Sequence, residues 1–253
     1  MTVALPPFHT QGAFDNSSYS HWTGEGLVMA NGEPAPHMAQ DVHSALRAVL
    51  HDPDFPCVGA KSIVNQSSYR FGLYRQLCGP GSTEGLALDL YRFQSEMHNI
   101  EGEFHSFIAC FLEPKMTNPK TFETLLWQQL AALHELSKPH FHWNAEVSKE
   151  PDDPRFSFSF GGAAYFVVGL SPASKRWARR FPWPTLVFND HFQFERLREA
   201  QRFDRIRDLI RERDQALHGN NNPMLEDHGA HSEARQYSGR EVGPDWRCPV
   251  RFD

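Results

Sequence analysis

The clearest candidate for chemistry in this sequence is a cysteine at the start of a predicted helix. Cys57 follows Pro56 in the stretch DPDFPCVGAKS (52–62), and the residues after it have helical character. Its sulfur would therefore lie beside unpaired backbone N–H groups, at the positive end of the helix dipole. That environment favours a thiolate, and a thiolate is one of the ligands that proteins provide to haem iron. Gly59 would allow a flat ligand to approach the backbone. A buried, inert cysteine is the commoner alternative.

Two histidine groups are candidates for metal binding. The first is in LHELSKPHFHW (133–143), where His134 lies near the end of a predicted helix and two more histidines follow it. The second is in DHGAHSE (227–233), where His228, His231 and Glu233 could form a two-histidine, one-carboxylate iron site. Surface or loop histidines are the simpler interpretation of both groups, because nothing in the spacing imposes a ligand geometry.

Several common cofactor motifs are absent. Gly79-Pro80-Gly81 does not continue as a dinucleotide fingerprint, because Glu84 occupies the position of the third glycine. The chain also lacks a P-loop, a G-x-S-x-G elbow, an H-E-x-x-H pair and a C-x-x-C pair. These absences argue against a Rossmann site, and therefore against a flavin enzyme of that type.

The composition is that of a folded protein with no polyanion partner. The 253 residues carry a net charge of −6, which gives no reason to expect binding to nucleic acid, and no polybasic face suggests a membrane surface. No signal peptide and no run of about 18 apolar residues is found. The four cysteines are scattered, so reduced thiols in a cytoplasmic protein are the expectation. The aromatic share of 13% predicts a thick core or the wall of an apolar pocket.

Hydrophobic periodicity predicts five helical segments. A helix is expected from Ala39, a second over 61–77, a third over 83–98 with Thr83 as its N-cap, and a fourth after Asn118-Pro119. A last helix over 203–217 should turn four apolar residues inward, namely Ile206, Leu209, Ile210 and Leu217.

Strand signals cluster in the middle of the chain. EFHSFIACFLE (103–113) and TLVFN (185–189) are typical of buried strands. RFSFSF and AAYFVVGL flank Gly161-Gly162, a pattern that predicts a hairpin. The order of elements favours an α+β fold, a single domain with a central, mostly antiparallel sheet flanked by helices. Residues 1–38 are expected to be an irregular N-terminal arm, and residues 39–253 the folded domain.

Several blocks of the sequence together resemble the YqcI/YcgG family. They are FPCVGAKS (55–62), the long block from FSFSFGGAAYFVVGL to NDHFQFERLR (156–198), NPMLEDHGAHSEARQYSGR (222–240) and WRCPV (246–250). Two positions depart from the family pattern. Ser171 stands where relatives often carry histidine in GLHP, and Val250 stands where the usual ending is CPF.

The resemblance implies an activity. Characterised members of the family are haem-dependent N-oxygenases that hydroxylate a guanidine nitrogen of arginine or of a related amino acid, as in the D-cycloserine and guanitoxin routes. The implied requirements are haem b, O2, an external electron donor or reductant, and an amino-acid or amine substrate. The domain at 39–253 would then be the haem-binding catalytic domain. Oligomeric state stays open, with a homodimer as one option.

Candidate roles follow from this resemblance. Cys57 is the first choice for the axial iron ligand, His191 in FNDHFQFE is the alternative and His134 is the third choice. Gly59 would face the cofactor.

Charged residues near the end of the chain are the candidates for binding carboxylates and substrate. Guanidinium groups bind carboxylates through two parallel hydrogen bonds. The expected ligands of haem propionates or a substrate carboxylate are Arg176, Arg179 and Arg180, with a surface cluster as the alternative. The group expected to bind the substrate is Glu233, Arg235, Tyr237 and Arg240. That group could equally be a buried polar network that fixes the C-terminal segment.

Two other functions remain compatible with the sequence. One is a haem-binding protein without oxygenase turnover, such as a sensor or carrier. The other is a non-haem iron enzyme that uses His228, His231 and Glu233.

Overall fold

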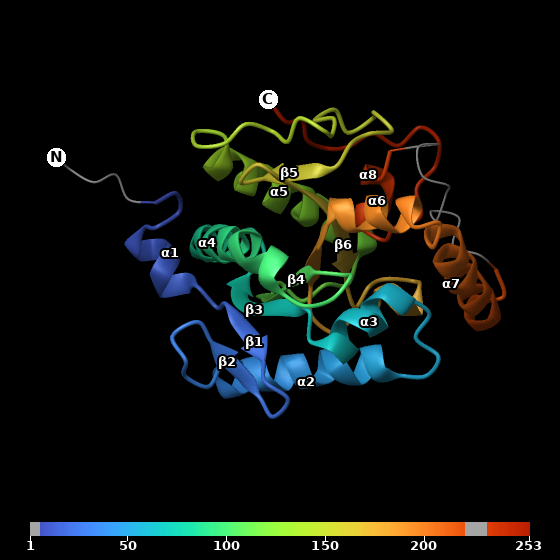
Figure 1. Cartoon of the computed structure of the whole chain (residues 1–253). Coiled ribbons are helices and arrows are strands. Elements are labelled where there is room, and N and C mark those ends of the chain that lie inside the picture. Colours follow the sequence, from blue (N-terminus) through green and yellow to red (C-terminus); the bar gives the residue numbers. More distant parts are fainter. Residues whose placement is uncertain (1–5, 221–231) are drawn as a thin grey trace.

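A seven-stranded sheet forms the centre of the molecule (Figure 1). The computed structural model describes residues 6–220 and 232–253. The strand order is β2-β1-β3-β4-β7-β6-β5, and every neighbouring pair is antiparallel except β3 and β4. The strands are Ser20–Trp22 (β1), Leu27–Met29 (β2), Tyr69–Gln76 (β3), Ser106–Glu113 (β4), Phe158–Phe160 (β5), Ala163–Leu170 (β6) and Thr185–Asp190 (β7). The predicted α+β class with a mostly antiparallel sheet is confirmed.

Helices cover both faces of the sheet. Figure 1 shows α4 and α5 on one side of it and α2 and α3 on the other. The helices of the described residues are Gln11–Asn16 (α1), His37–His51 (α2), Val58–Gln66 (α3), Pro80–Glu96 (α4), Pro119–Ser137 (α5), His191–Glu199 (α6), Phe203–His218 (α7) and Ala234–Tyr237 (α8), with short 3-10 turns at Met97–Asn99 (η1) and Trp177–Arg179 (η2). Within those residues, none of the helices is long and apolar enough to cross a membrane.

The sheet separates two hydrophobic cores. Successive side chains of a strand point to opposite faces, and β4 follows this rule. Phe107 and Phe111 belong to the first core cluster, beside α4 and α5, whereas Ile108 and Cys110 belong to the second core cluster, beside α2 and α3. Side chains in different cores are therefore kept apart by the thickness of the sheet.

Several predicted elements are confirmed together with their local causes. Helix α5 begins at Pro119, and the Asn118 side chain accepts the Lys120 N–H at 2.8 Å, as an N-cap should. Strands β5 and β6 form the expected hairpin. Gly161 and Gly162 adopt φ of 61° and 84° between them, which residues with a Cβ rarely do.

The helix predicted over 61–77 is wrong in its second half. Helix α3 ends at Gln66, and Ser67 adopts a left-handed conformation with φ of 54°. The chain then enters β3, which pairs in parallel with β4. Aromatic residues such as Tyr69 and Phe71 fit a pleated surface, and pairing with a distant strand outweighs the helical periodicity.

The start of α4 and the exposure of α7 also differ from the prediction. Gly79, not Thr83, is the N-cap of α4, and the Thr83 hydroxyl donates back to the Gly79 carbonyl at 3.0 Å. Leu209 and Leu217 of α7 are each 38% exposed rather than buried. Helix α7 lies at the periphery of the fold and packs on α3 and α6, so only part of its apolar face is covered.

The N-terminal segment is part of the folded unit. Residues expected to form an irregular arm contain α1, β1 and β2, and β1 joins the sheet beside β3. Helix α1 packs closely on α4, since a Cβ at Gly85 would overlap the backbone carbonyl of Asn16. This close approach between two helices explains the need for glycine there.

A buried carboxylate fastens this segment to α4. The Asp89 carboxylate accepts the Ser17 hydroxyl at 2.5 Å, the Ser18 N–H at 2.7 Å and the Tyr74 hydroxyl at 2.7 Å. Arg92 lies 3.5 Å away. The Asp89 side chain has no exposed surface, so these donors replace the water that it loses on folding.

Asp89 should impose a pH dependence on stability. Burial raises the pKa of Asp89 from 3.8 to about 6, although the surrounding donors oppose that rise. The folded protein therefore binds this proton more tightly than the unfolded chain does. The stabilisation is present below about pH 4 and is lost as pH rises through about 6. The quantity to compare is the unfolding free energy of the wild type minus that of Asp89→Asn. We expect this difference to be about 2 kcal/mol larger at about pH 4.5 than at about pH 7.5.

Urea unfolding at the two pH values measures this difference. Asp41→Asn, an exposed change on α2, is the control and should show no such pH dependence. A wild-type to Asp89→Asn difference that stays constant over this range would contradict the prediction.

Candidate active site

Cys57 lies at the N-terminus of α3, as the sequence predicts. It is the N-cap residue of the helix, and its sulfur accepts the Ala60 N–H at 3.5 Å. The side chain is half-buried and packs against the second core cluster. The sulfur is thus oriented by the backbone in a largely apolar environment.

The ionisation of Cys57 differs from the expectation that the helix terminus favours a thiolate. Burial raises the pKa of the Cys57 thiol, and it outweighs the N–H groups of Ala60 and Gly59 and the charge of Arg179, which lower it. Burial wins because a thiolate loses its hydration in an apolar environment. A metal ion that coordinates the sulfur would displace this proton in any case.

Arg179 is the cation that the structure brings near Cys57. Its Nη1 donates to the carbonyl of Gly169 at 3.2 Å and to that of Tyr237 at 3.5 Å. Gly239, with φ of 70°, packs against its methylene groups. Burial lowers the pKa of Arg179 to about 10. Over the described ranges no carboxylate is within ion-pair distance of Arg179, so its charge is available to an anionic group of a ligand.

The other two arginines of the cluster are engaged elsewhere. Arg176 forms a buried ion pair with Asp214 of α7 at 3.2 Å. Arg180 is exposed and donates to the backbone carbonyls of Ser174 and Lys175. The structure thus separates three residues that the sequence places within five positions.

Aromatic side chains share the second core cluster with Cys57. The rings of Phe55 and Trp177 are 5.5 Å apart, and both belong to the second core cluster or pack against it. A Cβ at Gly59 would be 3.8 Å from the ring of Phe104, so Gly59 faces this ring. Neither Phe55 nor Trp177 is among the candidate residues that the sequence predicts. Phe55 lies two positions before Cys57, and Trp177 lies two positions before Arg179. This closeness in sequence is the signal that could have identified them.

His191 is the first residue of α6, directly after β7, as predicted. Its side chain is buried, and its ring meets the Phe192 ring edge-on at 5.4 Å. The N-cap of this helix is Asp190, which also forms an ion pair with Arg196 at 2.9 Å. Helix α6 contributes Leu197 to the second core cluster, and Phe194 packs against this cluster, as Cys57 does.

His134 lies across the sheet from Cys57. Its Nε2–H donates to the Asp253 carbonyl at 3.2 Å, and its ring packs edge-on against Trp143 and Phe252. Trp143 and Phe252 belong to the first core cluster or pack against it. His134 and Cys57 would therefore serve two different sites.

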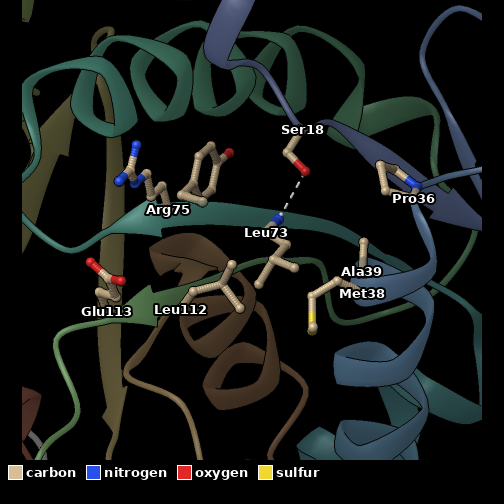
Figure 2. A pocket seen from close by; sticks show the side chains of 9 residues that line it. Ser18, Pro36, Met38, Ala39, Leu73, Arg75, Leu112 and Glu113 are labelled. Carbon is tan, nitrogen blue, oxygen red and sulfur yellow. Dashed lines mark hydrogen bonds between the residues drawn. The ribbon is translucent and has the colours of Figure 1, made fainter.

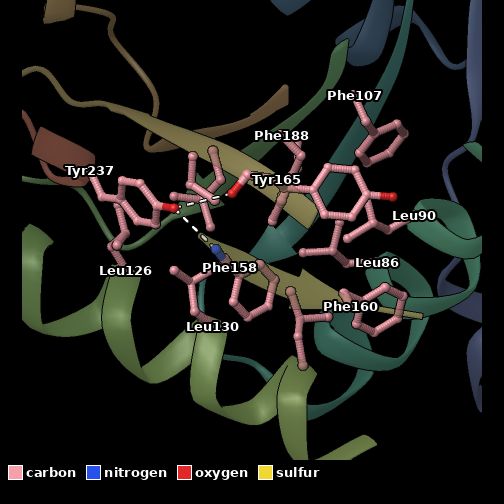
Figure 3. Close-up of a cluster of buried hydrophobic side chains, with 14 of the residues drawn as sticks. Leu86, Leu90, Phe107, Leu126, Leu130, Phe158, Phe160, Tyr165, Phe188 and Tyr237 are labelled. Atoms are coloured by element: carbon pink, nitrogen blue, oxygen red, sulfur yellow. Dashed lines mark hydrogen bonds between the residues drawn. The ribbon is translucent and has the colours of Figure 1, made fainter. Parts of the chain in front are cut away.

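Tyr237 occupies a buried position between β5 and β6. Its hydroxyl accepts the Phe158 N–H at 3.2 Å and donates to the Tyr165 carbonyl at 3.1 Å (Figure 3). Its ring stacks on Trp127 at 5.5 Å. These contacts match the alternative of a buried polar network, so we assign Tyr237 to the support of the sheet.

Removing the Tyr237 hydroxyl should lower stability and leave the chemistry intact. In Tyr237→Phe the Phe158 N–H and the Tyr165 carbonyl lose a buried partner, which costs about 1–3 kcal/mol. Urea unfolding measures the loss, and turnover per folded molecule should stay at the wild-type value. A large fall in turnover without a change in stability would show that Tyr237 is a catalytic residue and contradict its assignment to the support of the sheet.

Arg240 belongs to a separate polar network around Glu123 rather than to an open cleft. Its Nε and Nη2 donate to Oε2 of Glu123 at 2.9 and 2.6 Å. The other carboxylate oxygen accepts the Ser238 hydroxyl at 3.3 Å and the Trp246 indole N–H at 3.1 Å. Glu123, which the sequence analysis did not single out, thus ties the C-terminal segment to α5.

The remaining site candidates lie in three different places. Glu233 is half-buried at the N-cap position of α8. His228 and His231, which would complete the iron site with it, lie outside the described residues. Ser171 is buried, and its N–H donates to the Arg179 carbonyl at 2.9 Å. Ser171, which replaces the histidine of the family's GLHP pattern, therefore lies beside Arg179, whose charge acts on Cys57. Val250 packs against the first core cluster.

Comparisons with known proteins identify the family. Residues 46–251 match the YqcI/YcgG family. Among similar proteins of Bacillus subtilis (strain 168), the uncharacterized protein YqcI is 28% identical over 68% of this chain and 70% of its own length. The uncharacterized protein YcgG is 24% identical over 63% of this chain and 64% of its own length, slightly under two thirds. No solved structure gives a significant match. Because the match spans most of the sequence, this chain belongs to the YqcI/YcgG family.

Proposed function

We propose that this chain is a haem-dependent N-oxygenase that hydroxylates a guanidine or amine nitrogen of an amino acid, arginine or a related metabolite. The observation that carries the proposal is the Cys57 sulfur at the start of α3, which accepts the Ala60 N–H and feels the charge of Arg179. The cofactor would be haem b, which when bound supplies the activation of O2 with electrons from an external donor.

The residues around Cys57 have the chemistry that such a cofactor requires. The ligand is a sulfur that already accepts a backbone N–H, a contact of the kind that tunes metal-bound thiolates. Trp177, which is half-buried and packs on the buried ring of Phe55, offers apolar surface to a flat macrocycle. Arg179 offers a charge that a propionate would neutralise, since a buried guanidinium is stabilised by an anion.

The protein's own groups would orient the reactants and exclude water. The Ala60 N–H fixes the direction of the sulfur, and the carbonyls of Gly169 and Tyr237 fix the guanidinium of Arg179. If the haem propionates do not bind Arg179, its guanidinium would be free to bind the α-carboxylate of the substrate. Glu233 stays the candidate carboxylate for a substrate guanidinium.

The alternatives differ in how well these contacts support them. His191 remains the alternative ligand, because α6 packs into the same core cluster as Cys57. His134, the third choice, would require a cofactor on the opposite face of the sheet. Arg180 is exposed, and Arg176 is already paired with Asp214, so both are weaker candidates for a propionate.

The absorption spectrum of the purified protein tests the proposal. We expect a Soret band in the oxidised protein and, after reduction with added CO, a band at the long wavelength typical of thiolate-bound haem. With O2, a reductant and arginine or related amines, an N-hydroxylated product should form. A protein that stays colourless after haemin is supplied would contradict the proposal. A Soret band without product from any amine favours a haem sensor or carrier, and iron without porphyrin favours a non-haem site.

A further inference from the structure

A cavity lies apart from the residues placed around Cys57. It has a volume of about 480 Å³ and is lined by Ser18, Pro36, Met38, Ala39, Leu73, Tyr74, Arg75, Leu112 and Glu113 (Figure 2). Pockets of a few hundred cubic ångströms are typical of small-molecule sites. None of these residues contributes to the surroundings of Cys57 or of Arg179, so the cavity is not explained by the proposed function.

The cavity lies between the N-terminal segment and the central strands β3 and β4. Four of its nine lining residues come from positions 18–39, and the other five come from the ends of β3 and β4. The family match begins at residue 46, so one wall of the cavity lies outside the matched region. That wall is held in place by Asp89, which binds both the Ser18 N–H and the Tyr74 hydroxyl. The cavity is therefore a feature of how the N-terminal segment packs in this chain.

The lining combines an apolar floor with two opposite charges. Leu73, Leu112 and Met38 turn toward one another in Figure 2, and Met38 is 51% exposed. Arg75 and Glu113 lie at the end of the cavity away from Met38. Across the described part of the chain, neither charged side chain forms a hydrogen bond or an ion pair, and the two are not paired with each other.

Charge complementarity identifies the class of ligand. A ligand with only a carboxylate would pair with Arg75 but would be repelled by Glu113. A ligand with only an ammonium would pair with Glu113 but would be repelled by Arg75. A zwitterion neutralises both groups at once, and an apolar side chain would cover the leucine and methionine floor. The Ser18 oxygen already accepts the Leu73 N–H at 2.9 Å, which leaves its own O–H to donate to a ligand. We propose that this cavity binds a small zwitterionic α-amino acid with an apolar side chain.

Titration calorimetry with three matched probes tests the proposal. The probes are L-leucine, its amide, which lacks the carboxylate, and 4-methylpentanoate, which lacks the amine. Each lost charge removes one charge-assisted contact, so leucine should bind at least about tenfold more tightly than either analogue. No saturable binding of leucine, or equal binding of either analogue, would overturn the proposal.

Variants then locate the binding in this cavity. Arg75→Gln should weaken leucine at least about tenfold without weakening the amide, whose ammonium no longer faces a like charge, and Glu113→Gln should weaken leucine without weakening 4-methylpentanoate, for the corresponding reason. Arg251→Gln, another exposed arginine, is the control and should bind like the wild type. Both test residues are exposed, so the variants should fold, which a circular dichroism spectrum checks. Wild-type binding by both test variants would place leucine elsewhere and overturn the assignment.

Discussion

Serine in place of Cys57 is expected to abolish the thiolate-type spectrum of the haem-loaded protein and to lower N-oxygenation at least about a hundredfold. Changes in the outer shell of a metal site already cost about 10–100-fold, and this one removes the proposed ligand itself. Serine is also a good N-cap, so α3 should persist with little change in stability. The ferrous-CO spectrum, the rate of product formation and the urea midpoint separate loss of the ligand from loss of the fold.

Two further variants make this experiment decisive. Cys248→Ser is the matched control, because Cys248 is also half-buried but packs against the first core cluster, away from Cys57. It should leave spectrum and turnover unchanged. His191→Ala tests the alternative ligand. If Cys57→Ser keeps the wild-type spectrum and His191→Ala loses it, His191 replaces Cys57 as the iron ligand.

Glutamine in place of Glu123 is expected to lower the unfolding free energy by about 2–3 kcal/mol, less than the loss for a fully buried ion pair because the Arg240 side chain is 29% exposed. The Glu123 side chain is 8% exposed, and its oxygens accept donors from Ser238, Arg240 and Trp246. In Glu123→Gln the guanidinium of Arg240 loses its counter-ion and an amide N–H₂ meets other donors. The C-terminal segment should then detach more readily from α5.

Urea unfolding measures the loss of stability, and limited trypsin digestion at Arg247 and Arg251 reports detachment of the segment. Glu135→Gln is the control on the same helix, where an exposed pair with Lys138 contributes at most about 1 kcal/mol. Equal stability losses in the two variants would show that the Glu123 network does not fasten the C-terminal segment.

Several elements follow from the sequence because their causes are local. The Asn118 cap and Pro119 define the start of α5 within two residues, and Gly161-Gly162 supplies the positive φ values that the hairpin needs. Cys57 becomes the N-cap of α3 for a similarly local reason, since Pro56 precedes it and helix-forming residues follow. Each of these interactions spans a few positions of the chain, so the pattern of residue types contains the necessary information.

Other features depend on partners that are distant in the sequence. The segment predicted as a helix after residue 66 becomes β3 because β4, more than thirty positions later, provides a parallel partner. The segment expected to be an arm joins the sheet because Asp89 binds its backbone and hydroxyl groups. Local periodicity cannot register such contacts, since their stabilisation appears only when the chain is folded.

The same distinction applies to the candidate site. The sequence by itself identified Cys57 as a sulfur at a helix start and named the arginines that could accompany it. The tertiary structure decided that Arg179 accompanies it, that Arg240 pairs with Glu123, and that His134 belongs to the other core. The physical reason is the sheet: its two faces assign each side chain to one core or the other, and no spacing along the chain encodes which distant residues share that core.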